Sequence, residues 1–345
     1  MSQPTGADAA MITAAMRFLL VLALTVFVAK GAPAASGQAG SADIPALQKA
    51  AKKGDAAAQF QLGRAYYRGN GVDKDPKKAL ELIRKAADAG NPDAIDSMGF
   101  LYANGEIVEL DESQAVKWFR RGAEAGLARS KLNLGLLLRQ GKTIQPSAAE
   151  SLKLMEEAAA AGLPEAKSYL GQLYFNGDRH LKPDYAKSYP YVKEAAEAGD
   201  PACQNLMGIF CRDGLGVRED FNEPHSREEA AGWFRKAALQ NDLKAQSNLA
   251  HTLGVGSPAC KDPKEAFKWL IVAKDRGEIT AVKTYEELFK TVPSSVLVAA
   301  RLEANRFSML KQAEAEARKK RGGDAGTPAS VEAKGEAPAS KDPAS

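Results

Sequence analysis

The segment LGRAYYRGNGVDKDP, residues 62–76, comes nearest in this chain to a phosphate-binding loop. It contains Gly63 and the Gly-x-Gly pair Gly69 and Gly71, and the backbone N–H groups of such a turn can hold a nucleotide phosphate. Both established fingerprints also need a context, either a preceding strand or a Lys followed by Ser or Thr. Neither is found here, so we interpret the segment as a connection between two helices.

Cysteine and histidine are the next residue types that could do chemistry. The cysteines, Cys203, Cys211 and Cys260, are odd in number and contain no Cys-x-x-Cys pair, so the sequence predicts neither a disulfide framework nor a zinc site. Cys211 occupies a core position of a predicted helix and is expected as a buried thiol; a Cys211–Cys260 bridge remains a minor alternative. The histidines lack metal-ligand spacing: His180, His225 and His251.

An acidic turn is the remaining candidate for cation binding, and its carboxylates are Glu106, Glu109, Asp111 and Glu112. A solvated turn in which Asp111 caps the next helix accounts for the same residues, and we prefer that interpretation. The sequence therefore predicts no metal, no cofactor and no catalytic residue. A formal net charge of +4 over 345 residues, with no dense basic stripe interleaved with aromatic residues, also argues against a nucleic-acid partner.

A repeat of 36 to 42 residues organises the middle of the chain. Its first half carries a small residue, a large apolar residue and two glycines at fixed offsets, as at Ala58, Leu62, Gly63 and Gly69. These offsets gather on one face at 100° per residue, which predicts a helix that ends at the last glycine. The anchor positions that begin the units are Gly54, Gly90, Gly126, Gly162, Gly199, Asn241 and Gly277.

The second half of each unit predicts another helix. Its first turn follows a residue whose side chain can accept from unpaired backbone N–H groups. That column holds Asp75, Asp111, Ser147, Asp184, Ser226 and Asp262. Small and large apolar columns recur further along, as at Ala79 and Trp118, and fill the space between units.

The columns resemble the Sel-1-like repeat family, a relative of the tetratricopeptide repeat, with Ala58, Leu62, Gly63, Tyr66 and Gly69 among the matching residues. The resemblance implies an all-α fold, a right-handed α-solenoid superhelix of about six helix-turn-helix repeats with capping helices. We expect this domain to span 44–321. Its units lie near 55–90, 91–126, 127–162, 163–199, 200–241 and 242–277, and closing helices occupy 278–321.

The two ends of the chain differ from the repeats. An apolar run from Phe18 to Ala29 follows Arg17, and small residues follow the run, which is typical of a secretory signal. We predict a signal peptide over 1–35, with an uncleaved inner-membrane anchor as the alternative, and a linker over 36–43. Residues 322–345 lack Leu, Ile and aromatic residues and are predicted to be disordered.

A second face of the first helices is not constrained by the repeat. In solenoids of this family these helices line the concave surface, and many side chains there are apolar or Arg. We predict that they bind a partner protein: Arg64, Tyr67, Phe100, Leu132, Leu136, Arg139, Phe175, Ile209 and Arg212. On this prediction, substituting Phe100 and Leu136 with Glu should abolish capture of the partner protein without unfolding the array of repeats. The alternative is that tight curvature buries part of this face.

The resemblance implies a non-enzymatic periplasmic or secreted scaffold in envelope signalling, regulation or host contact. Its partner would be another protein or peptide of the cell envelope, with no stable membrane span after signal cleavage. One secreted subgroup is Cys-rich and hydrolyses β-lactams, but the position expected to pair with Cys203 holds Ala195 or Ala196 here. This departure counts against membership of that subgroup. The alternatives to a scaffold are a β-lactam-hydrolysing or peptidoglycan-active enzyme on the same fold and a glycan-binding module.

Overall fold

The computed structural model describes residues 43–140, 147–215, 227–256 and 260–320, and within these ranges its regular elements are helices without a strand. The helices are α2 (Ile44–Lys52), α3 (Ala56–Arg68), α4 (Pro76–Asp88), α5 (Pro92–Asn104), α6 (Glu112–Glu124), α7 (Ala128–Gln140), α8 (Ala148–Ala160), α9 (Pro164–Asn176), α10 (Tyr185–Glu197), α11 (Pro201–Asp213), α12 (Arg227–Leu239), α13 (Leu243–Thr252), α14 (Pro263–Asp275), α15 (Ile279–Leu288) and α16 (Ser294–Lys320).

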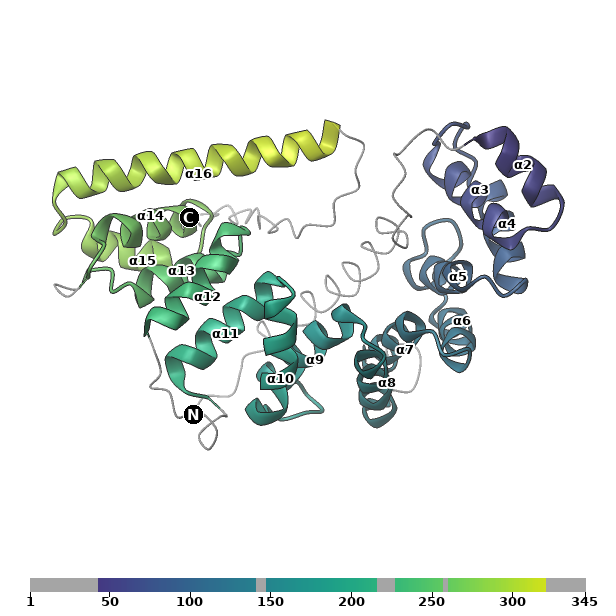
Figure 1. The fold of residues 1–345 in the computed structure, drawn as a ribbon, viewed down its shortest axis with the longest axis horizontal. Coiled ribbons are helices and arrows are strands. Elements are labelled where there is room, and N and C mark those ends of the chain that lie inside the picture. The colour runs from purple at the N-terminus through teal and green to yellow at the C-terminus, as the bar shows by residue number, and fades with distance from the viewer. Residues whose placement is uncertain (1–42, 141–146, 216–226, 257–259, 321–345) are drawn as a thin grey trace, which may run out of the picture.

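The helices form antiparallel pairs that follow one another along an open arc (Figure 1). Each pair from α3–α4 to α13–α14 corresponds to one predicted unit, so the expected α-solenoid is confirmed. In Figure 1, α7 and α9 lie on the inner side of the arc, and their partners α8 and α10 lie on the outer side. In these two repeats the first helix therefore faces the concave side of the arc (Figure 1).

Capping side chains set where the second helices begin, as the sequence predicted. Asp75 and Asp111 each accept from the N–H three residues on at 3.0 Å, and Asp262 does so at 2.8 Å. Ser147 is an exception, because its side chain makes no capping hydrogen bond. Ser226, in the same column, lies outside the described residues. Gly69 takes the left-handed conformation that ends α3.

The glycine inside each first helix allows its partner helix to approach closely. A Cβ added at Gly99 would lie 2.5 Å from the Phe119 ring, and one at Gly135 would lie 2.9 Å from the Ser151 carbonyl oxygen. The Ser151 hydroxyl also donates to the Gly135 carbonyl at 2.6 Å. The two helices of a repeat are thus held by small residues and by a hydrogen bond onto the backbone.

A buried glutamine ties several repeats to the preceding unit, and the sequence analysis missed this device. The Gln59 amide donates to the Ala51 carbonyl at 3.2 Å, and Gln204 donates to the Ala196 carbonyl at 3.1 Å. Each carbonyl belongs to the last turn of a helix and also accepts from the N–H of the glycine three residues later. The glutamine therefore adds a second hydrogen bond to one helix end from the next repeat.

Long helix α16 closes the stack by packing along α14, where Trp269 and Phe307 meet edge to face at 5.1 Å. The predicted half-unit at the other end is α2, packed against α3 through Leu47 and Leu62. The predicted signal peptide (1–35), linker (36–43) and disordered tail (322–345) lie outside the described residues, apart from Asp43.

Candidate functional site

The structure divides the nine side chains predicted to bind a partner into two groups. Phe100, Leu132, Leu136 and Arg139 are buried, with exposed fractions of 3, 3, 3 and 4%. The others are partly or well exposed: Arg64, Tyr67, Phe175, Ile209 and Arg212. The second group alone can contact a partner on the concave surface.

The expectation that Phe100, Leu132 and Leu136 line an exposed groove is wrong. Phe100 belongs to the core shared by α3, α5, α6 and α7, and Leu132 and Leu136 pack in one cluster with Leu170. Large apolar side chains of α3, α5 and α7, and of α7 and α9, pack together and fill the space between these helices. This packing buries the stretch, and Glu at Phe100 or Leu136 would unfold the repeat rather than test binding.

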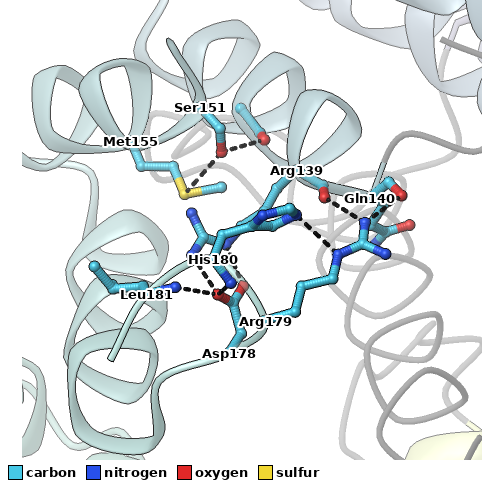
Figure 2. Close-up of polar contacts among 9 residues, drawn as sticks. Arg139, Gln140, Ser151, Met155, Asp178, Arg179, His180 and Leu181 are labelled. Carbon is cyan, nitrogen blue, oxygen red and sulfur yellow. Dashed lines mark hydrogen bonds and ion pairs between the residues drawn. The ribbon is translucent and has the colours of Figure 1, made fainter. Parts of the chain in front are cut away.

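Arg139 is also not available to a partner, because it forms a buried ion pair with Asp178 (Figure 2). Its Nε and Nη2 donate to the two carboxylate oxygens at 2.6 and 2.8 Å. The side chain of Asp178 is only 8% exposed and accepts further from the N–H groups of His180 and Leu181 at 2.8 and 2.9 Å. Burial alone would raise the pKa of Asp178, but these hydrogen bonds outweigh it and lower the pKa.

A second arginine fixes the same loop to the end of α7. The Nη2 of Arg179 donates to the carbonyls of Arg139 and Gln140 at 3.2 and 3.1 Å, and its Nε donates to His180 (Figure 2). Gly177 ends α9 with extended ψ instead of the left-handed turn that ends α3, α5 and α11, and this lets the loop reach back to repeat 3. The signal for this was the segment GDRHLKP, which departs from the pattern of the other units.

Polar side chains of α11, α13 and α15 form a different concave surface. The amide of Asn248 donates to Asn205 at 2.9 Å and accepts from Arg212 at 3.4 Å. The ring of His251 reaches Thr284 at 3.2 Å. We call this group the concave polar ladder, and its members are Asn205, Arg212, Asn248, His251 and Thr284.

Most of the concave polar ladder contacts water, unlike Phe100, Leu132 and Leu136 in α5 and α7. The exception is Asn205, which is buried, with 6% of its surface exposed. Arg212 and His251 are exposed, and Ile209 lies between Asn205 and Arg212 on the same stripe of α11 with part of its surface exposed. The sequence analysis found Ile209 and Arg212 but missed Asn205, Asn248, His251 and Thr284. A hydrogen-bonding residue six, seven or ten positions after each anchor was the available signal.

Arg64 and Tyr67 lie at the other end of the arc, on α3. The hydroxyl of Tyr67 donates to the Glu106 carboxylate after α5, and the guanidinium of Arg64 lies 5.7 Å from the Phe60 ring centroid. Burial is the main cause that lowers the pKa of Arg64, followed by the like charge of Arg68. These two side chains therefore take part in contacts within and between the first repeats.

A buried carboxyl group lies between repeats 2 and 3. The side chain of Asp96 in α5 accepts from the hydroxyl of Ser130 in α7, and Asp96 is 5% exposed. Burial raises the pKa of Asp96 to about 6, although the Ser130 hydrogen bond and Arg129 act in the opposite direction. Gly122 leaves room for the pair, because a Cβ there would lie 2.1 Å from the Ser130 hydroxyl oxygen.

The cysteines are present as thiols. Cys203 is fully buried, and its Sγ lies 3.6 Å from the Ser168 hydroxyl; Cys211 is buried as predicted. Burial raises the pKa of both thiols, that of Cys211 to about 12. A thiol with a raised pKa is a poor nucleophile at neutral pH. The minor alternative of a Cys211–Cys260 bridge is wrong, because neither residue forms a disulfide.

Within the part of the chain that the structure describes, no group of three or more His, Cys, Asp or Glu side chains is placed to hold a metal ion. The acidic turn after α5 uses Glu106 to accept from Tyr67 and Asp111 to cap α6. A search of the same residues for a helix long and apolar enough to cross a membrane found none.

The comparisons with known proteins agree with the repeat geometry. The Sel1 repeat model matches six consecutive segments: 56–91, 92–127, 128–163, 164–200, 201–242 and 243–278. No curated protein matches. Among solved structures, the chain is similar to a Sel1 repeat protein from Oxalobacter formigenes. The two are 26% identical over 68% of this chain and 100% of that one, with a TM-score of 0.56.

A second similar structure is a protective antigen present in uropathogenic Escherichia coli strains, which displays an SLR fold. The identity is 29%, 76% of this chain is covered, and the TM-score is 0.65. The match covers 56% of that antigen's length, so the chain spans little more than half of it. Six matched repeats over residues 56–278 place the chain in the Sel1 repeat family.

Proposed function

We propose that this protein is a non-enzymatic scaffold of the bacterial cell envelope that binds a segment of another protein on the concave polar ladder and Ile209. The observation that carries the proposal is the exposure of this stretch. Hydrogen-bonding side chains reach solvent on α11, α13 and α15, at Arg212, His251 and Thr284. In contrast, Phe100 of α5 and Leu136 of α7 are packed into the core. Exposed side chains that the fold does not require are available for recognition.

The chemistry of the surface suits a protein segment. Asn248 presents both a donor and an acceptor, as a peptide group does. Arg212 adds further donors, and its charge is paired with the neighbouring Asp213 at 2.6 Å. Ile209 supplies apolar contact area beside them. A surface that combines one apolar contact with several hydrogen-bonding groups has the composition of a non-obligate protein–protein interface.

The experiment is capture of the partner by the tagged full-length chain from envelope extracts. Ile209→Glu places a charge in the middle of the proposed surface and should abolish capture of the protein that the wild type retains. Lys153→Glu on the outer helix α8 is the matched control, since Lys153 is exposed and far from the ladder along the chain. Equal capture by both variants would contradict the proposed surface.

The envelope location rests on the sequence of residues 1–35. An alkaline phosphatase fusion to residue 43 should be active outside the cytoplasm, and mass spectrometry of the purified protein should find a new N-terminus near residue 35. Retention of residue 1 in the membrane fraction would favour the uncleaved anchor. An inactive fusion would reject export.

The non-enzymatic assignment has its own test. The Sel1 repeat family is generally a non-catalytic scaffold. The purified chain should therefore hydrolyse nitrocefin, a chromogenic β-lactam, no faster than buffer alone does. Turnover that disappears with a point substitution would establish the enzyme alternative.

A further inference from the structure

Helix α16 carries a second apolar face that the solenoid does not use. Its inner face packs on α14 through Ala300, Ala304 and Phe307, which are exposed by 0, 2 and 8%. Val298 and Leu302 are each 71% exposed. At 100° per residue these two lie on the opposite side of the helix from Phe307.

The exposed face gathers large apolar side chains that are scattered along the chain elsewhere. Of eight large hydrophobic side chains exposed among the described residues, Val298, Leu302 and Met309 lie on this face of α16, and Leu310 lies to one side of it. In Figure 1, α16 runs along α14 and continues past it, at the edge of the molecule. A unit that caps a solenoid ordinarily has a polar outer face, so this stripe needs another explanation.

The spacing of the stripe selects a helix as its occupant. The apolar residues of this face, Val298, Leu302 and Met309, are spaced by four and seven positions, with the polar Asn305 between the last two and Glu316 beyond them. This spacing fits the 3.5-residue repeat by which one helix packs into another. A lipid surface fits less well, because Asn305, Gln312 and Glu316 lie on the same line and would enter the apolar layer.

The charges beside the stripe select the kind of helix. Arg306 is exposed on one flank, and no acidic side chain of the described residues forms an ion pair with it. Arg301 lies on the other flank, where its Nη1 meets Asp275 at 2.5 Å. A parallel second copy of α16 would bring Arg301 against Arg306, whereas glutamates on the opposing helix would pair with Arg306.

We propose that the outer face of α16, centred on Leu302 and Met309, docks an amphipathic helix of another protein that has an apolar seam and acidic flanks. This surface is separate from the concave polar ladder. Ion pairs hold α16 in place from its inner side, where Lys264 meets Glu303 at 2.9 Å. The docking face is therefore presented on a fixed support.

Two synthetic peptides of about four heptads, with Leu along the seam and either Glu or Lys on the flanks, serve as probes. Fluorescence anisotropy with the full-length chain should show the Glu peptide binding at least about tenfold more tightly than the Lys peptide. Arg306→Glu should remove or reverse that preference. Equal affinity for the two peptides would overturn the proposal.

Leu302→Asp should weaken binding of the Glu peptide by at least about tenfold, because it puts a charge into the apolar seam. Its thermal unfolding should match the wild type, since Leu302 is exposed. Ile279→Asp in α15 is the control, because Ile279 is equally exposed at 71% and lies outside the stripe. An equal loss in both variants would contradict docking on α16.

Two further measurements exclude the other occupants. Light scattering during size-exclusion chromatography should give the monomer mass, and a dimer that Leu302→Asp dissociates would replace the helix partner with a second copy. Vesicles of phosphatidylglycerol should not bind the chain through α16. Vesicle binding that Leu302→Asp abolishes would overturn the proposal in favour of a membrane.

Discussion

The concave sides of α5–α7 and α11–α13–α15 are built from equivalent positions of the same repeat and differ in their exposure to solvent. In the first stretch, Leu132 and Leu136 are packed into the core and Arg139 is sealed in an ion pair. In the second, Ile209 and Arg212 reach solvent beside a ladder of amides. One repeat position thus serves stability in one half and is available for recognition in the other.

The comparison shows that a position outside the repeat signature is not automatically a binding position. Large apolar residues on successive first helices pack against one another and exclude water, and they thereby become part of the hydrophobic core. Amide and guanidinium groups at the same places hydrogen-bond to each other and keep contact with solvent. Side-chain chemistry therefore decides whether the concave face closes or stays open.

The largest expected effect separates the two stretches directly. Leu136→Glu buries an unpaired carboxylate and should lower the free energy of unfolding by at least about 4 kcal/mol. Ile209→Glu, on the same position of α11, should lower it by about 1 kcal/mol, because the new charge reaches water. Urea denaturation followed by circular dichroism measures both, and similar losses would mean that the second stretch is also core.

The next effect concerns the ion pair that seals the first stretch. Arg139→Ala leaves the Asp178 carboxylate buried without its charge partner and should cost about 3–5 kcal/mol of unfolding free energy. Arg179→Ala removes hydrogen bonds from an exposed side chain and should cost about 1 kcal/mol. Thermal unfolding of the two variants tests this order. If Arg179→Ala proved the more damaging, the loop would be held from outside rather than by the buried pair.

A smaller effect depends on pH and concerns Asp96. Its folded pKa of about 6 lies above the ordinary 3.8, so the folded protein holds this proton more tightly than the unfolded chain does. The stability it contributes is therefore full below pH 3.8 and is lost as the pH rises through about 6. At neutral pH, Asp96→Asn should be more stable than the wild type by up to about 3 kcal/mol.

The Asp96→Asn difference should shrink towards zero in acid. Unfolding free energies of the wild type and the variant, measured at about pH 4 and about pH 7.5, give the two values. Ser130→Ala serves as the control, because it removes the hydroxyl that pairs with Asp96 without adding a titrating group. A difference that stays constant over this range would mean that Asp96 does not titrate with a raised pKa.

The periodic part of the fold was predictable from the sequence. The close approach of a partner helix requires a glycine at Gly99 and Gly135. The start of the next helix requires a capping side chain, as at Asp75 and Asp111. Each requirement therefore appears as a fixed residue type at a fixed offset. Such local requirements repeat in every unit. Aligning the units by these positions therefore predicts both the helices and the repeat family.

The concave surface was only partly predictable, because its exposure depends on neighbouring repeats. Leu136 and Ile209 occupy the same offset and are both apolar, yet Leu136 meets α9 and Ile209 stays partly exposed. The Arg139–Asp178 pair joins residues 39 positions apart through an irregular loop. Neither contact follows from a helix face considered alone.

The most direct test of the account is photo-crosslinking in intact cells with p-benzoylphenylalanine placed singly at Ile209, at Arg212 and at Lys153. The account predicts a covalent adduct of the same size from Ile209 and Arg212 and none from Lys153 on the outer helix. Adducts from Lys153 alone, or adducts of unrelated sizes from the two α11 positions, would contradict a partner bound on the concave polar ladder.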